Sequence, residues 1–221
     1  MKIDKVEKEN KYEILGFILV YIILFSNAFI THDSWIALVS AFCGISYTIL
    51  AGKGFPVCYL IGVIGSIFYS YLSLKSALWG NLILYMLYYV PMQITGFFQW
   101  NKNLKNGKNE IVKTKLTNKE RIIYFIASSV LSVLVGCILA HLGDTEPFID
   151  SITTVFSILG MYLTVRRAID QWIVWMIVNG LSFIMWLSIA LSGVKVYSTV
   201  IMWGVYFLLA FYFYYRWKKE I

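Results

Sequence analysis

Apolar stretches recur along the chain, each close to the ~20 residues that a helix needs to cross a bilayer. Short polar turns separate most of them, and one long basic segment interrupts the series. Proline stands at the start of two stretches, at Pro56 and Pro147, where a helix tolerates it. We therefore predict an all-α integral membrane protein with eight transmembrane helices, at residues 12–30, 34–51, 56–74, 78–99, 122–142, 147–165, 172–191 and 196–217.

The order of these stretches indicates an internal repeat. A shift of 116 positions aligns Gly44 with Gly160 and Ser66 with Ser182, and the two copies hold three stretches each. One single stretch between them keeps both copies in the same orientation, as parallel repeats require. We expect an N-terminal arm and extra transmembrane helix at 1–33, a first three-helix repeat at 34–101, a cytoplasmic basic loop at 102–121, a linker helix at 122–146, and a second three-helix repeat with a cytoplasmic tail at 147–221.

The seventh stretch, DQWIVWMIVNGLSFIMW, combines indoles with small polar groups. At 100° per residue, these indoles and polar groups fall within an arc of about 80° on one face of the helix. One interpretation is a wall that faces a ligand; another is helix packing with an interfacial tryptophan. Because indole N–H and amide groups inside a membrane need partners, we favour the ligand wall. Its candidate binding residues are Trp172, Trp175, Asn179, Ser182 and Trp186.

A second stripe of this kind runs along the fourth stretch, over an arc of about 120°. Gln93 favours a ligand-facing role, because an amide in mid-membrane is costly without a partner. Packing, with Trp100 at the interface, is the alternative. Pro91 lies in mid-span and should kink this helix. The candidate binding residues here are Asn81, Tyr85, Tyr89, Gln93 and Trp100.

The charges predict the orientation. Of 221 residues, 59% are hydrophobic and only 14% are charged. A cytoplasmic N-terminus places 17 of the 19 basic residues inside and leaves Lys75 and Lys195 outside. We therefore expect the cell inner (plasma) membrane with both termini cytoplasmic, and we interpret the net charge of +7 as a topology signal, with no nucleic-acid partner. Arg166, Arg167 and Asp170 are expected to pair with one another or with lipid head groups.

Coupling and catalytic groups are scarce in this sequence. Asp, Glu, Lys, Arg and His stay near the ends of the predicted spans, which disfavours ion-coupled transport. There is no HExxH motif or P-loop, so we expect no enzyme, cofactor or metal site. Cys43, Cys58 and Cys137 lie in apolar spans and suit a core. Ser26–Ala28 resembles a signal cleavage site, but three acidic residues precede it, so we expect the first span to be retained.

Taken together, these residues resemble the PnuC-type vitamin transporters, whose nicotinamide riboside members carry a Trp-x-x-Trp motif followed by an Asn. Here Trp172, Trp175 and Asn179 match that motif, and the run GNLILYMLYYVPMQITGFFQW resembles the family's span that ends in Gln-x-x-Gly and a Trp. The resemblance covers residues 34–217. It implies a fold like that of SWEET sugar transporters, a homotrimer, and facilitated diffusion of a dephosphorylated vitamin. Phe97 departs from the pattern, because a Trp is expected after Gly96.

The implied substrate suits the residues. Nicotinamide riboside has a cationic pyridinium that indole faces attract, a carboxamide that amides can pair with, and a ribose for hydroxyls. Thiamine or riboflavin remain alternatives within the family. A SWEET-like sugar carrier is a further alternative, and a membrane-embedded enzyme or assembly factor belongs to another class. The expected partners are this vitamin, the lipid bilayer and two further copies of the chain.

Overall fold

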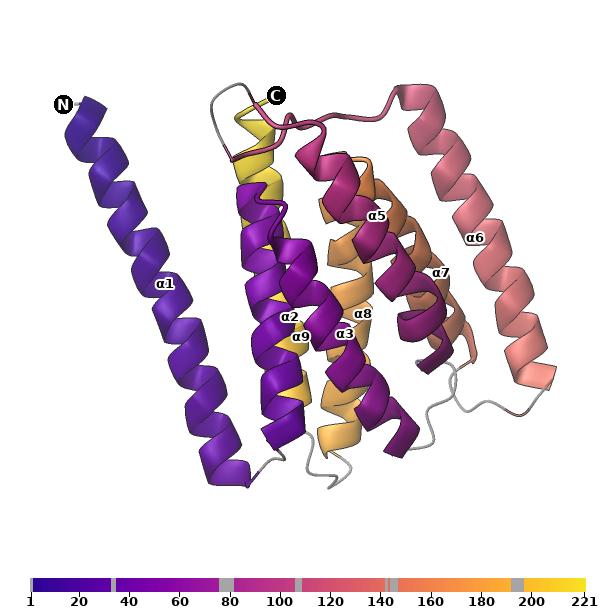
Figure 1. The fold of residues 1–221 in the computed structure, drawn as a ribbon. Coiled ribbons are helices and arrows are strands. Elements are labelled where there is room, and N and C mark those ends of the chain that lie inside the picture. Colours follow the sequence, from indigo (N-terminus) through magenta and orange to yellow (C-terminus); the bar gives the residue numbers. More distant parts are fainter. Residues whose placement is uncertain are drawn as a thin grey trace.

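The computed structural model describes residues 2–32, 35–75, 82–105, 109–141, 143, 147–191 and 197–221. Every extended regular element in these ranges is helical, which confirms the all-α prediction (Figure 1). If the π-helical turn η1 and α5 are counted as one helix, the described residues form eight. The elements are α1 (Lys2–Thr31), α2 (Trp35–Lys53), α3 (Cys58–Lys75), η1 (Leu84–Tyr89), α5 (Val90–Asn101), α6 (Asn118–His141), α7 (Pro147–Val165), α8 (Gln171–Leu191) and α9 (Tyr197–Lys218).

Several of these helices are suited to a bilayer. Within the described residues, four are long and apolar enough to cross it by length and composition, at Lys11–Ile30, Asn118–His141, Pro147–Val165 and Gln171–Ser188. Shorter apolar helices cover Leu38–Lys53 and Cys58–Tyr71. The chain is thus a multi-pass membrane protein. Its first helix begins at Lys2, so the charged arm continues the helix, as the good helix formers in its sequence favour.

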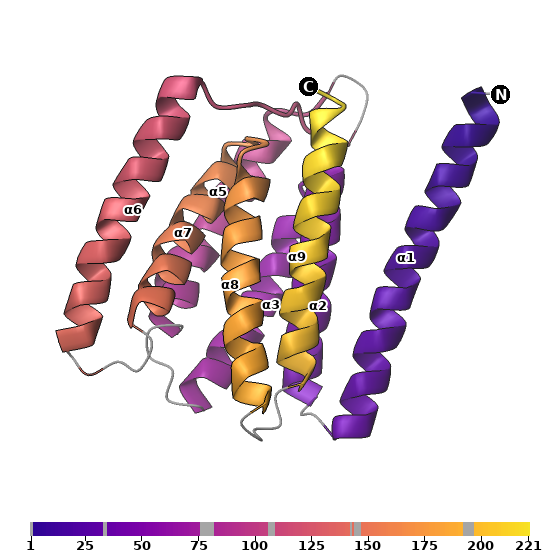
Figure 2. The ribbon, with the colours of Figure 1, turned by 180° about the vertical axis from the view of Figure 1, so that it is seen from behind.

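Six helices pack in a closed ring. α3 packs against α2 and α5, while α8 packs against α7 and α9; the two groups meet where α2 contacts α9 and α5 contacts α7. The order around the ring is therefore α2, α3, α5, α7, α8, α9 (Figures 1 and 2). α1 lies outside against α2 and α9, and α6 lies on the opposite flank against α7. Both termini and the segment between α5 and α6 lie at one end of the bundle, the terminal end.

Proline has a different effect at each of its positions. Before Pro91 the helix widens into η1, and Val90 N–H bonds to the Tyr85 carbonyl five residues back. The cause is that proline has no N–H and its ring crowds the carbonyl four residues earlier. Pro147 begins α7, as predicted. The prediction for Pro56 is wrong: α3 begins at Cys58, because the first amides after Pro56 bond three residues back in a tighter turn.

Candidate functional site

The predicted stripe on α8 faces the protein interior. Asn179 and Ser182 are buried, whereas Ile173 and Ile184 on other faces are exposed. Trp175 is fixed in place, because its Nε1 donates to Thr164 Oγ1 at 3.1 Å and its ring lies against Gly160, where an added Cβ would come within 3.0 Å of the indole. The stripe thus presents an aromatic plane and polar groups towards the ring of helices.

The carboxamides of the two predicted stripes, Gln93 and Asn179, differ in their bonding. Gln93 on α5 is only 4% exposed, and its Nε2 donates to Ser66 Oγ on α3 at 3.1 Å. Gly62 makes room for it, since a Cβ there would lie 3.1 Å from Nε2. Asn179 is 5% exposed, and its side chain has no hydrogen bond to any residue that the structure describes. Of these two amides, Asn179 is therefore the one with unused donors and acceptors.

Tyrosines continue the α5 stripe into η1. Tyr85 lies 4.6 Å from Tyr89 and 4.4 Å from Tyr69 of α3, measured between ring centroids. Tyr69 belongs to neither predicted stripe. On α9, the Tyr206 hydroxyl lies against Gly44 of α2, where any Cβ would clash. Tyrosines from α3, η1 and α9 thus line this part of the interior. Asn81, the first member of the predicted stripe, lies outside the described residues, and Trp186 is partly buried.

The interfacial interpretation of Trp172 and Trp100 is wrong. Trp172 is buried against Phe213 and Trp217, with ring centroids 5.4 and 5.6 Å away. Trp100 is fully buried edge-on to Tyr59, and its Nε1 donates to the Thr164 carbonyl at 2.9 Å. Both indoles belong to the aromatic core at the terminal end. Their predicted substrate contact stays a prediction.

Thr164 is a residue that the stripe analysis missed. It is buried on α7, and it accepts the Trp100 N–H through its carbonyl and the Trp175 N–H through its hydroxyl. It therefore holds one tryptophan from each candidate stripe. The sequence gives no signal of this role, because threonines are common at helix–helix contacts in membrane proteins.

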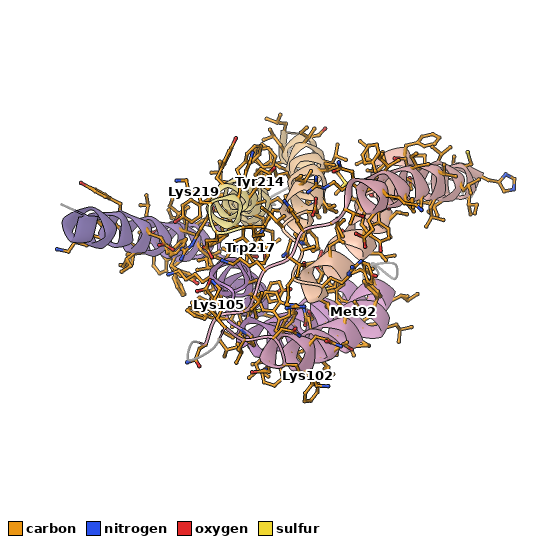
Figure 3. All side chains as sticks on the ribbon, turned by 90° about the horizontal axis from the view of Figure 1, so that it is seen from above. Met92, Lys102, Lys105, Tyr214, Trp217 and Lys219 are labelled. Atoms are coloured by element: carbon orange, nitrogen blue, oxygen red, sulfur yellow. The ribbon has the colours of Figure 1, made fainter. Side chains whose placement is uncertain are left out.

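The segment from Asn109 to Thr117, which we name the strap, crosses the terminal end of the ring. Ile111 N–H donates to the Gly54 carbonyl at 3.0 Å, in the turn between α2 and α3. Thr114 N–H donates to the Arg167 carbonyl at 2.9 Å, and Ile169 N–H donates back to Thr114 at 2.8 Å, in the turn between α7 and α8. Figure 3, which looks onto this end, shows the strap passing across the bundle. The basic loop is thus more than a linker, because it joins both halves of the ring.

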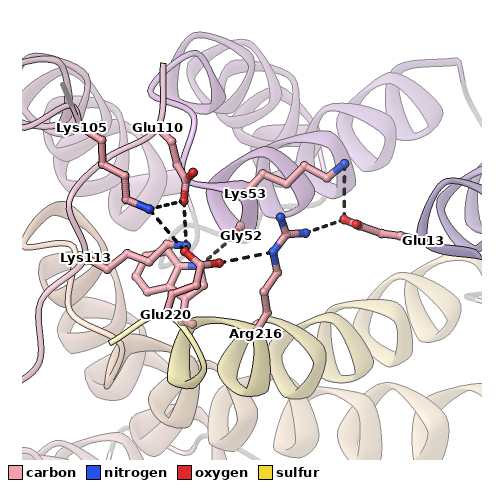
Figure 4. Close-up of polar contacts among 9 residues, drawn as sticks. Glu13, Gly52, Lys53, Lys105, Glu110, Lys113, Arg216 and Glu220 are labelled. Carbon is pink, nitrogen blue, oxygen red and sulfur yellow. Dashed lines mark hydrogen bonds and ion pairs between the residues drawn. The ribbon is translucent and has the colours of Figure 1, made fainter. Parts of the chain in front are cut away.

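An ion-pair cluster holds the strap (Figure 4). The Lys113 side chain is 2% exposed, bonds to Glu110 and Glu220, and lies with its ammonium 5.0 Å from the Trp217 ring centroid. Burial raises the pKa of Glu110, but hydrogen bonds from Lys105 and Lys113 outweigh it and bring that pKa to about 2. Glu110 therefore stays ionised throughout the physiological pH range.

The turn between α7 and α8 is tied to the strap and to α6. Asp170 accepts the Leu116 N–H at 2.8 Å and the Arg121 Nε at 2.6 Å. Arg166 pairs with Glu120 at 3.2 Å, and Arg167 donates to the Val112 carbonyl at 3.0 Å. Arg166, Arg167 and Asp170 thus bond to the strap and to α6 rather than to one another, and their expected contact with lipid head groups stays a prediction.

Known proteins share this architecture. A family described as nicotinamide mononucleotide transporter matches residues 34–219. The nicotinamide riboside transporter PnuC of Neisseria mucosa is 34% identical over 194 residues, which cover 86% of this chain and 74% of that protein. Its Haemophilus influenzae counterpart is 29% identical, over 86% of this chain and 82% of the relative. The crystal structure of the vitamin B3 transporter PnuC superposes with a TM-score of 0.82 at 30% identity, covering 94% of this chain and 91% of that one.

Proposed function

The chain belongs to the nicotinamide mononucleotide transporter family, and we propose that it carries nicotinamide riboside into the cytoplasm by facilitated diffusion. It is a membrane transporter and not an enzyme. The proposed contacts are the residues of the two stripes, with Trp175, Asn179 and Gln93 as the central ones: Trp172, Trp175, Asn179, Ser182, Trp186, Asn81, Tyr85, Tyr89, Gln93 and Trp100.

The observation that carries the choice of substrate is an interior with amides, hydroxyls and aromatic rings but without a phosphate ligand. Between residues 54 and 101, and between 168 and 215, the only cationic side chains are Lys75 and Lys195, at or beyond the ends of α3 and α8. A nucleotide's phosphate is usually held by Arg or Lys. A phosphate-free nucleoside therefore suits this chain better than the mononucleotide in the family's description. The Trp175 face suits the pyridinium cation, and the unpaired Asn179 amide suits a carboxamide.

Uncoupled transport follows from the charge distribution. The middles of the predicted spans hold no carboxylate or histidine that could relay protons or bind sodium. Import, with both termini cytoplasmic, is supported by the basic residues and by the terminal end, where both termini and the strap lie together. Trapping of the product inside the cell would then give the direction of net flow.

The proposed architecture is two parallel three-helix repeats joined by α6, with α1 as an extra helix. The order of helices around the ring supports it, since half a turn exchanges α2 with α7, α3 with α8, and α5 with α9. The homotrimer is a prediction from the family resemblance alone. Mass measurement of the purified protein in detergent tests it, and a monomer would exclude it.

Calorimetric titration with nicotinamide riboside tests the site. Trp175→Ala should remove a cation–π contact worth ~1 to 2 kcal/mol, and Asn179→Ala a hydrogen bond worth ~1 kcal/mol or more. Each should weaken binding by roughly five- to thirty-fold, at tenfold per 1.4 kcal/mol. Trp175→Phe should be milder because an aromatic face remains. Trp35→Ala, at an exposed tryptophan of α2, is the matched control and should bind normally.

Two outcomes would count against this proposal. Unchanged affinity in both alanine variants, with lower melting temperatures, would mean that the α8 stripe serves packing alone. Tighter binding of thiamine or riboflavin, titrated in parallel, would replace the substrate while leaving the site in place.

A further inference from the structure

Gln171, the first residue of α8, is an unexplained buried amide. Its side chain is 1% exposed, and neither Oε1 nor Nε2 has a hydrogen-bond partner among the residues that the structure describes. The next residue, Trp172, also has a buried Nε1 without a partner in that part of the chain. Buried polar side chains are normally paired, so two unpaired ones in succession need a physical reason.

Local structure does not supply that reason. Asp170 caps this end of the helix, because its carbonyl accepts the Ile173 N–H and its carboxylate accepts the Leu116 N–H and the Arg121 Nε. The backbone N–H groups of Gln171 and Trp172 donate to the carbonyls of Ala168 and Ile169, respectively. The Gln171 side chain thus has no capping role, and an apolar residue of equal size would fill its place without leaving polar atoms unpaired.

The position of Gln171 on the helix suggests where its partner comes from. At 100° per residue, Gln171, Trp175, Asn179 and Ser182 share an arc of about 80° on α8. Gln171 lies one turn, roughly 6 Å, beyond Trp175 in the direction of the terminal end. The strap, with its buried Ile111, crosses that end. A solute that leaves Trp175 along this face therefore meets Gln171 before it reaches the strap.

We infer that Gln171, together with the unpaired Nε1 of the next residue, Trp172, is a second contact point for the transported solute, between the Trp175 level and the strap. This inference rests on the proposed transport function and extends it to the exit half of the path. The ligand group is uncharged and hydrogen-bonding, such as a carboxamide or a sugar hydroxyl, because a glutamine amide both donates and accepts while an indole N–H donates. The contact forms in transit, which explains why both groups lack a partner at rest.

Gln171→Leu tests the inference, because leucine keeps much of the bulk and removes both polar atoms. In proteoliposomes, exchange of labelled nicotinamide riboside should slow at least about fivefold. Calorimetric affinity should stay within about twofold of the parent protein, and the melting temperature should be equal or higher. Gln171→Asn keeps the carboxamide and should retain more of the flux than Gln171→Leu.

Ser70→Ala is the matched control, because the Ser70 hydroxyl of α3 is likewise buried and unpaired among the described residues. It should leave the flux unchanged. Normal flux in Gln171→Leu would overturn the inference and leave water or simple packing as the explanation of the amide. A lower melting temperature or failure to fold would overturn it too, since the amide would then have a structural partner. Failure of the proposed binding site would be seen separately, because Asn179→Ala would then bind nicotinamide riboside with normal affinity.

Discussion

The strap should loosen when its buried lysine is replaced. Lys113→Met keeps the length of the side chain and removes the ammonium that bonds to Glu110 and Glu220 and lies over Trp217. A charge-assisted hydrogen bond contributes ~1.5 to 3 kcal/mol, and an ammonium–indole contact ~1 kcal/mol or more. Lys105 remains near both carboxylates, at 3.0 Å from Glu110 and 3.5 Å from Glu220, and offsets part of the loss.

We therefore expect a net loss of about 2 kcal/mol in the free energy that holds the strap closed. This corresponds to a roughly thirtyfold increase in the population of open strap, at tenfold per 1.4 kcal/mol. If the loss also enters global unfolding, the melting temperature falls by about 4 to 8 °C for a chain of this size.

A native thiol reports on the opening. Cys58, the first residue of α3, is fully buried in the same cluster as Ile111 of the strap. In a background of Cys43→Ser and Cys137→Ser, maleimide labelling of Cys58 should become roughly thirtyfold faster in Lys113→Met. The control is Lys102→Met, which removes an exposed lysine at the same end of the bundle.

Equal labelling rates in Lys113→Met and the parent protein would refute the reasoning, because the strap would then be held by its backbone hydrogen bonds alone. Faster labelling in Lys102→Met as well would show that the net charge of this end, and not the ion-pair cluster, controls access.

Four other predictions concern acid stability, ion coupling, packing and topology. The pKa of Glu110 lies near 2, below the usual value of 4.5, so the stabilisation from this carboxylate is complete above about pH 4.5 and is lost towards pH 2; the melting temperature should therefore be flat from about pH 5 to 8. Proton or sodium gradients should not concentrate the substrate in proteoliposomes. Gly96→Ala should lower the melting temperature, because its Cβ would lie 2.4 Å from the Tyr59 ring, whereas Gly16→Ala, with nothing within 4 Å, should not. Cysteines placed near either terminus should resist labelling from outside intact cells, and modification of either would refute the predicted orientation.

Much of the fold is predictable from the sequence, because membrane helices can be recognised from their local composition. The seventh stretch was expected at 172–191 and is α8 at Gln171–Leu191, and α7 begins and ends where the apolar pattern does. The inward face of α8 was also predictable, since Asn179 and Ser182 recur at helical spacing. Each of these features depends only on residues within one helix.

Features that depend on contacts between distant segments were not predictable. The strap has little apolar periodicity, and Ile111 is buried only because Gly54, some fifty residues earlier, offers its carbonyl. Trp100 resembles an interfacial residue by its place near the end of a span, yet it is buried in the core, where its Nε1 donates to the Thr164 carbonyl. Nothing in the sequence marks Gln171 as an unpaired amide, and only the absence of hydrogen-bond partners among the described residues shows it.

The carboxylate of Glu13 has a consequence for how the protein is made. Arg216 donates to it at 2.7 Å and Lys53 lies 3.4 Å away, so the first helix is tied to α2 and to the last (Figure 4). Because Arg216 follows Glu13 by 203 residues, this link forms only after nearly the whole chain has left the ribosome. Until then Lys53 is the partner of Glu13 that is already in place. A chain that stops short of α9 therefore lacks both the Arg216 link and the packing of α1 on α9, and holds its first helix through α2 alone.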